Sequence, residues 1–278
     1  MSFSPILPSG GLMGWAYLGR TQDRQMALQA ADPQQSRLEA SFRDRIAGIT
    51  TAEALVADRA VLQVALGAFG LDDDINNRFF IRRVLESDLS DGGSLANRLA
   101  DKQYLALAEA FGLGGETPQT TTTGFADTIL SAYRSRQFEI AVGEKDDTLR
   151  LALNAERELA ELAGADSSEA TKWYTILGTA PLREVFETAY GLPDGFGLID
   201  IDQQAQVLRD RTEQLFGSDS VSQFADADQL ETLVRRYILR AESVGTTNGT
   251  DSRSAALQLL QSASSGASLL SLIAARSG

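Results

Sequence analysis

The chain repeats itself, because segments of its first half return in the same order in its second half. The stretch LGAFGL at 66–71 returns as ETAYGL at 187–192. Upstream of it, RLEASFRDRI at 37–46 resembles RLALNAEREL at 150–159, and further on SLANRLADKQYLALAEAFG resembles DSVSQFADADQLETLVRRY. Internal recurrence in a fixed order indicates a structural unit that is used twice. We predict one helical unit over 15–115 and a second over 125–243, with a linker at 116–124 between them.

Apolar residues in both copies follow the spacing of one helical face. In the first copy these residues are Val61, Val64, Ala65, Ala68 and Phe69. The stripe ends at Gly70, its second copy ends at Gly191, and glycine commonly follows the last turn of a helix. Signals for strands are nearly absent. We therefore expect an all-α protein in which a duplicated multi-helix unit forms an elongated or two-lobed helical bundle.

The same spacing places the individual helices. In the first unit they are expected near 15–31, 35–49, 51–57, 59–69, 75–87, 94–98 and 101–112, and the second unit begins with helices near 125–141 and 146–163.

Two terminal segments lie outside the best-matched repeat. We expect residues 1–14 to be a flexible N-terminal segment and residues 244–278 to be a flexible tail rich in Ser, Gly and Leu. An isolated helix of this tail would be marginal and would order best against a partner. For Trp15 and Tyr17, core packing is the alternative to partner binding. The apolar residues that we predict to bind a partner are Leu12, Trp15, Tyr17, Leu257, Leu260, Leu269, Leu270 and Ile273.

Composition excludes several classes of function. The chain has no His and no Cys, so Ser-His triads, thiolate nucleophiles and zinc sites built from these ligands are excluded. A formal net charge of −13 argues against binding to nucleic acid, which needs clustered basic residues. No apolar run is long enough for a membrane span, and no basic residue precedes Arg20 as in a Sec signal. We predict no catalytic residues, no metal ligands and no cofactor.

Three groups of charged residues are candidate sites, each with a simpler interpretation. Asp72, Asp73 and Asp74 offer oxygen ligands for a cation, but an acidic run before a helix also caps it. Glu158 and Glu161 share a helical face, although a solvated face is the favoured interpretation.

The third group consists of two pairs of arginines that would suit phosphate, Arg82–Arg83 and Arg235–Arg236. Long cationic side chains more often lie along a helix and pair with carboxylates.

The chain resembles a known family in its most specific stretches. These are LGAFGLDDDINNRFFIRRVLESDLSDGGSLANRLADKQYLALAEAFG and the later LREVFETAYGLPDGFGLIDIDQQAQVLRDRTEQLFG, supported by GWAYLGRTQDRQ and LRLALNAERELAEL. They are similar to the duplicated helical domain of an alphaproteobacterial family of unknown function that is commonly linked with flagellar genes. The resemblance covers about 15–243. It implies a flagellum-associated protein and brings no catalytic residues with it.

Two hypotheses of function follow. The leading one is a non-enzymatic structural or assembly protein of the flagellum that acts through protein–protein contacts, with axial, export or regulatory flagellar proteins as partners and an oligomer as an option. Its location would be the flagellum or the cytoplasm. The alternative is an enzyme, or a module that binds a ligand or a metal, with an acidic pocket between the two helical units.

Overall fold

The structure is a computed structural model that describes residues 3–99, 101–115 and 117–249. These residues form α-helices and short 3-10 helices, with no strand among them. The predicted all-α fold is confirmed.

The helices of the first half match the predicted positions closely. They are α1 Gly11–Ala30, α2 Pro33–Arg45, α3 Ala52–Ala57, α4 Arg59–Ala68, α5 Arg78–Leu85, α6 Leu95–Arg98 and α7 Gln103–Phe111, with 3-10 helices η1 Ile46–Gly48, η2 Asp72–Asn76 and η3 Gln119–Thr121. Side-chain caps account for several starts. Asp32 caps α2 through the N–H groups of Gln34 and Gln35, and Asp58 caps α4 in the same way.

The helices of the second half repeat the order of the first. They are α8 Phe125–Gly143, α9 Asp147–Gly164, α10 Glu169–Gly178, α11 Ala180–Tyr190, α12 Ile201–Phe216 and α13 Ala227–Gly249, with η4 Phe196–Leu198 and η5 Val221–Ala225. The counterparts of α1 to α5 are α8 to α12, in that order. η2 and η4 occupy the same place, between α4 and α5 in one half and between α11 and α12 in the other.

The recurring glycine ends its helix by the same hydrogen bonds in both halves. Gly70 has φ +72° and Gly191 has φ +63°, the left-handed conformation that glycine adopts without steric cost. The N–H of the following residue bonds back over the last turn, from Leu71 to the carbonyl of Leu66 at 3.0 Å and from Leu192 to that of Glu187 at 2.9 Å. This is the Schellman ending of a helix. The sequence repeat therefore marks a repeated helix end.

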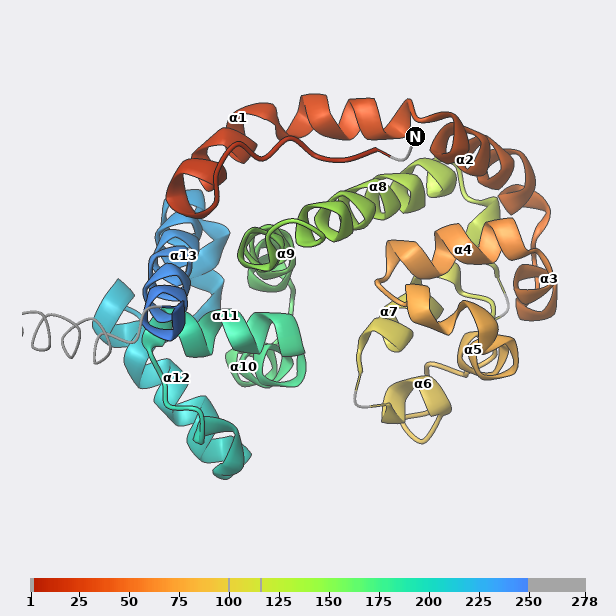
Figure 1. The fold of residues 1–278 in the computed structure, drawn as a ribbon. Coiled ribbons are helices and arrows are strands. Elements are labelled where there is room, and N and C mark those ends of the chain that lie inside the picture. The colour runs from red at the N-terminus through yellow and green to blue at the C-terminus, as the bar shows by residue number, and fades with distance from the viewer. Residues whose placement is uncertain (1–2, 100, 116, 250–278) are drawn as a thin grey trace, which may run out of the picture.

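Two large clusters of buried hydrophobic residues form the core. One lies among α2, α3, α4, α5, α7 and the start of α8, and the other among α1, the end of α8 and α9 to α13. In Figure 1 these helices form two groups, with α1 and α8 running between them. The helix α8 serves both clusters, since Tyr133 packs in the first and Phe138 in the second.

The first helix, α1, packs in the second cluster and not in the first. Trp15 and Leu18 are buried there, and the indole Nε1 of Trp15 donates to Glu231 Oε2 of α13 at 3.0 Å. The residues before α1 lie along α1 and α8. Lys145 Nζ donates to the carbonyl of Pro5 at 2.6 Å, and the ring of Phe3 contacts that of Phe138.

Candidate interaction surface

The acidic run folds into η2 and its side chains are taken up by neighbours. Asp72 accepts a hydrogen bond from Gln137 Nε2 at 2.9 Å, and Asp74 accepts one from the hydroxyl of Tyr104. Burial raises the pKa of Asp72, and the bond from Gln137 opposes this. Among the described residues, no group of three or more acidic, His or Cys side chains is arranged to hold a metal ion.

The carboxylates of α9 join an ion-pair network between α8 and α9. Arg157 pairs with Glu139 through two hydrogen bonds of 2.7 and 3.0 Å, and Arg136 Nη2 lies 2.7 Å from Glu158 Oε1. The sequence favoured a solvated face for Glu158, but its side chain is only 20% exposed because α8 packs over it. Glu161, on the same face, is exposed at its edge.

The arginine pairs also have partners within the chain. Arg82 and Arg83 both lie near Glu86, at 3.5 and 3.7 Å. Arg236 Nε donates to the carbonyl of Ala189 at 2.8 Å, in the last turn of α11. A cation at this end of a helix is favoured by the helix dipole and by the free carbonyls there.

A buried lysine is a group that reasoning from the sequence did not single out. Lys172 of α10 is only 3% exposed. Its ammonium donates to the carbonyl of Ala163, at the end of α9, at 2.9 Å and to Ser222 Oγ of η5 at 2.7 Å. Glu169 Oε1 lies 3.6 Å away. Ser222 lies 50 residues from Lys172 in sequence and Ala163 lies on the preceding helix, so no local motif predicts the contact.

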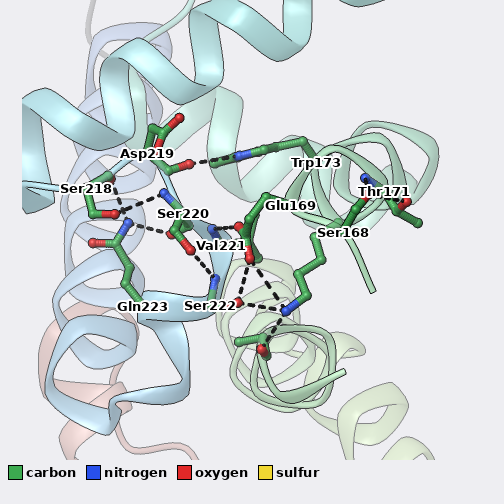
Figure 2. Close-up of polar contacts among 12 residues, drawn as sticks. Ser168, Glu169, Thr171, Trp173, Ser218, Asp219, Ser220, Val221, Ser222 and Gln223 are labelled. Atoms are coloured by element: carbon green, nitrogen blue, oxygen red, sulfur yellow. Dashed lines mark hydrogen bonds and ion pairs between the residues drawn. The ribbon is translucent and has the colours of Figure 1, made fainter. Parts of the chain in front are cut away.

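Figure 2 shows how this lysine site fastens η5 to the start of α10. Glu169 accepts from the N–H of Val221 at 2.6 Å and from Ser222 Oγ at 2.5 Å, and Trp173 Nε1 donates to the carbonyl of Asp219 at 2.9 Å. Burial alone would raise the pKa of Glu169, but the hydrogen bonds that Glu169 accepts from Ser222 and Val221 oppose this, and the pKa lies below its ordinary value.

A serine beside a buried lysine also invites an interpretation as a nucleophile and its base. That chemistry requires the hydroxyl to give its proton to the lysine. Here the hydroxyl of Ser222 donates to Glu169 and accepts from Lys172, which is the reverse direction. The arrangement joins three elements, α9, α10 and η5, and we assign it a structural role.

Outside this site, apolar side chains gather at the surface where η4 leads into α12. Leu198 is 90% exposed, and Ile199 and Ile201 are also exposed. Tyr174 of α10 lies beside them, because its hydroxyl donates to Asp202, the residue after Ile201. An exposed apolar group of this kind is typical of a binding surface. We call Tyr174, Leu198, Ile199 and Ile201 the α10–α12 surface.

A groove adjoins the α10–α12 surface. It has a volume of about 440 Å³ and is lined by Leu177, Gly178, Ala180, Arg183, Glu184 and Glu187. Gly178 follows Tyr174 by one helical turn of α10, and the guanidinium of Arg183 lies against Gly197, next to Leu198. Arg183 Nε is held by Glu187 Oε1 at 2.7 Å. Burial raises the pKa of Glu184, and nearby Asp147 adds to this.

The terminal residues that the sequence predicts as partner contacts have different fates. Trp15 is buried and Leu12 packs against the second cluster, whereas Tyr17 is half-buried. Leu257, Leu260, Leu269, Leu270 and Ile273 lie outside the described residues. Their role in binding a partner stays a prediction. The α10–α12 surface was missed because its residues form no amphipathic stripe, and only the fold shows which of them core packing leaves uncovered.

Comparison with known proteins gives a second example of the fold and a family. A protein from Agrobacterium tumefaciens, whose X-ray crystal structure comes from a structural genomics consortium, is 22% identical to this chain with a TM-score of 0.70, and the match covers 86% of this chain and 98% of that one. At this identity the likeness shows the fold alone. No curated protein matches the chain. No described helix is long and apolar enough to cross a membrane. The model of the family "Protein of unknown function (DUF1217)" matches residues 68–230, more than half of the chain, and the chain belongs to this family.

Proposed function

We propose that this chain is a non-enzymatic protein of the bacterial flagellum or of its assembly, and that it acts through protein–protein contacts. The α10–α12 surface carries the binding part of the proposal. A leucine that is 90% exposed, beside two exposed isoleucines and a tyrosine, costs solubility unless it meets a partner. The flagellar part rests on the sequence resemblance described above.

The state of the polar clusters supports a binding role over an enzymatic one. Glu139, Glu158 and Arg157 are engaged with one another, and Lys172 is engaged with Ala163 and Ser222. A general base or nucleophile must instead face a substrate. The groove beside the α10–α12 surface would receive a side chain of the partner.

The proposal is tested in cells that carry the chain as their only copy. We expect deletion to impair swimming or filament assembly, and Leu198→Ser with Ile201→Ser to impair it nearly as much while the chain accumulates normally. Met13→Ser is the matched control, because Met13 is 77% exposed and lies on α1, outside the α10–α12 surface. Normal swimming and normal flagella after clean deletion would exclude the flagellar role.

Two forms of the role are separated by fractionation. An axial component is expected in purified hook-basal bodies, whereas an export or regulatory factor is expected in the cytoplasmic fraction. A thermal shift with divalent metals and common metabolites tests the alternative of an acidic ligand pocket, since a ligand that binds only the folded chain raises its melting temperature.

A further inference from the structure

The first half of the chain has its own exposed apolar residue at the place that corresponds to the α10–α12 surface. Phe79 is 71% exposed and is the second residue of α5. α5 follows α4 and η2 in the chain as α12 follows α11 and η4. Both halves therefore expose large apolar side chains at the start of the same helix. This recurrence supports a shared role for the two exposed apolar patches.

The two patches differ in charge. On α5, Phe79 lies among Arg78, Arg82 and Arg83, and the guanidinium carbon of Arg82 is 5.5 Å from the centre of the Phe79 ring. In the described part of the chain Arg78 makes no ion pair. The helix α5 itself contains no carboxylate, and Glu86 directly follows its last residue. We call Arg78, Phe79, Arg82 and Arg83 the α5 surface.

The aspartates before α5 are partly turned away from this surface. Asp72 is bound by Gln137 of α8, and Asp74 is bound by Tyr104 of α7, which leaves Asp73 as the exposed member of the run. Three arginines on one short helix stand out in a chain whose formal net charge is −13.

The α10–α12 surface has exposed acidic neighbours instead, and the nearby Arg183 is paired with Glu187. Asp200 precedes Ile201 and Asp202 follows it, and both aspartates are exposed. Leu198 and Ile199 lie directly before this pair. The α5 surface has an exposed aromatic ring among arginines, and the α10–α12 surface has exposed aliphatic side chains among aspartates. The two surfaces are therefore both apolar and opposite in charge, and opposite charges orient two proteins when they meet.

The two surfaces cannot meet within one chain. Figure 1 shows α5 in the group of helices formed by α2 to α7 and α12 in the group formed by α9 to α13, on opposite sides of the molecule. Contact between them therefore requires two molecules.

We propose that the α5 surface of one chain binds the α10–α12 surface of a second copy of the same chain. Such a contact joins two different surfaces, so each new copy still presents one free surface of each kind. Repetition gives a ring if the rotation between copies closes and an open filament if it does not. The inference uses the surface on which the proposed function rests and names its partner.

The test uses the full chain and two single variants, Phe79→Ser and Leu198→Ser. Sedimentation velocity over a wide range of protein concentrations measures the association. We expect the wild-type chain to form species larger than a dimer as the concentration rises, and each variant to associate about tenfold or more weakly, as at central residues of an interface. Met13→Ser should behave as wild type.

Mixing the two variants gives the decisive result. The Phe79→Ser chain keeps an intact α10–α12 surface and the Leu198→Ser chain keeps an intact α5 surface, so an equimolar mixture should form dimers and nothing larger. Both side chains are largely exposed, so circular dichroism should show unchanged folding. Arg83→Glu gives a second variant of the α5 surface and should also weaken association. Raising the salt concentration should weaken association of the wild type, because salt screens exposed charges.

Three outcomes would overturn the proposal. They are a wild-type chain that stays monomeric, a Phe79→Ser chain that associates as the wild type does, and a mixture of variants that forms no dimer. If the wild-type chain is monomeric while Leu198→Ser still impairs swimming, the self-association is wrong and the proposed function stands with another partner.

Discussion

Arg240 of α13 lies directly against Gly191, the glycine that ends α11. A Cβ atom at position 191 would lie 2.1 Å from Arg240 Nη1. The first half repeats the relationship, since a Cβ atom at Gly70 would lie 2.7 Å from Arg136 Nη1 of α8. Each recurring glycine thus has two reasons to be glycine: a left-handed backbone and a guanidinium that occupies the place of a side chain.

Replacing Gly191 by alanine should destabilise the chain more than the backbone alone explains. The left-handed conformation costs alanine about 1 kcal/mol, and displacement of Arg240 should bring the loss in free energy of unfolding to about 2 kcal/mol. Urea denaturation measures it. Gly217→Ala is the matched control, because Gly217 has φ +87° and no atom within 4 Å of a Cβ. Equal losses at the two positions would show that Arg240 moves aside freely.

Lys172→Met should lower the free energy of unfolding by about 3 kcal/mol. The change leaves the carbonyl of Ala163 and the carboxylate of Glu169 without their buried cation. Arg43→Met is the control, since Arg43 and Asp127 form an exposed ion pair that contributes at most about 0.5 kcal/mol. A loss as small as that of the control would refute the structural role that we assign to the lysine.

Asp72→Asn should stabilise the chain near neutral pH and have less effect in acid. Burial raises the pKa of Asp72 above its ordinary value of 3.8 in the folded chain, so the folded chain holds the proton more tightly than the unfolded chain. The cost of the ionised carboxylate is therefore present above the folded pKa and is lost as the pH falls toward 3.8. Asparagine can still accept the hydrogen bond from Gln137.

The experiment compares urea midpoints of the wild type and the variant at neutral pH and near pH 4. Because Asp72 is partly exposed, we expect a gain below about 1 kcal/mol at neutral pH. Glu109→Gln serves as control, since Glu109 is exposed on α7. An equal difference at both pH values would contradict the assignment to Asp72.

Trp15→Phe should cost about 1 to 2 kcal/mol of unfolding free energy. It removes the hydrogen bond from the indole to Glu231 and leaves part of a buried volume empty. Tyr17→Phe, on the same helix, should change stability by less than about 0.5 kcal/mol, because Tyr17 is half-buried. Thermal or urea unfolding of both variants decides whether Trp15 contributes as a core residue.

The helices could be predicted well because their signals are local. The apolar stripe lies within α4, and the capping Asp58 and the glycine Gly70 lie next to its two ends. The helix α4 begins and ends within a residue of its expected bounds. The start of α1 at Gly11 is earlier than expected. Its N-cap is Gly10, which has no side chain to signal a cap.

The surface and the lysine site could not be predicted because they depend on distant segments. Lys172 meets Ser222 only when η5 folds back on α10. Leu198 has a hydrophobic side chain like any core leucine, and its sequence neighbours do not indicate that η4 places this side chain at the surface. Sequence spacing reports which residues share a helical face, but not which face another helix covers.

Because α8 packs in both clusters, the two copies of the repeat cannot be separated without removing core residues from each. A cut between residues 115 and 125 would separate the two copies of the ancestral segment in sequence, yet it would leave the first without Tyr133 and the second without Trp15. The first helix of one copy, α1, packs in the second cluster, and the start of the first helix of the other copy, α8, packs in the first cluster. We therefore expect that neither half folds as an independent protein and that the whole chain unfolds in one transition.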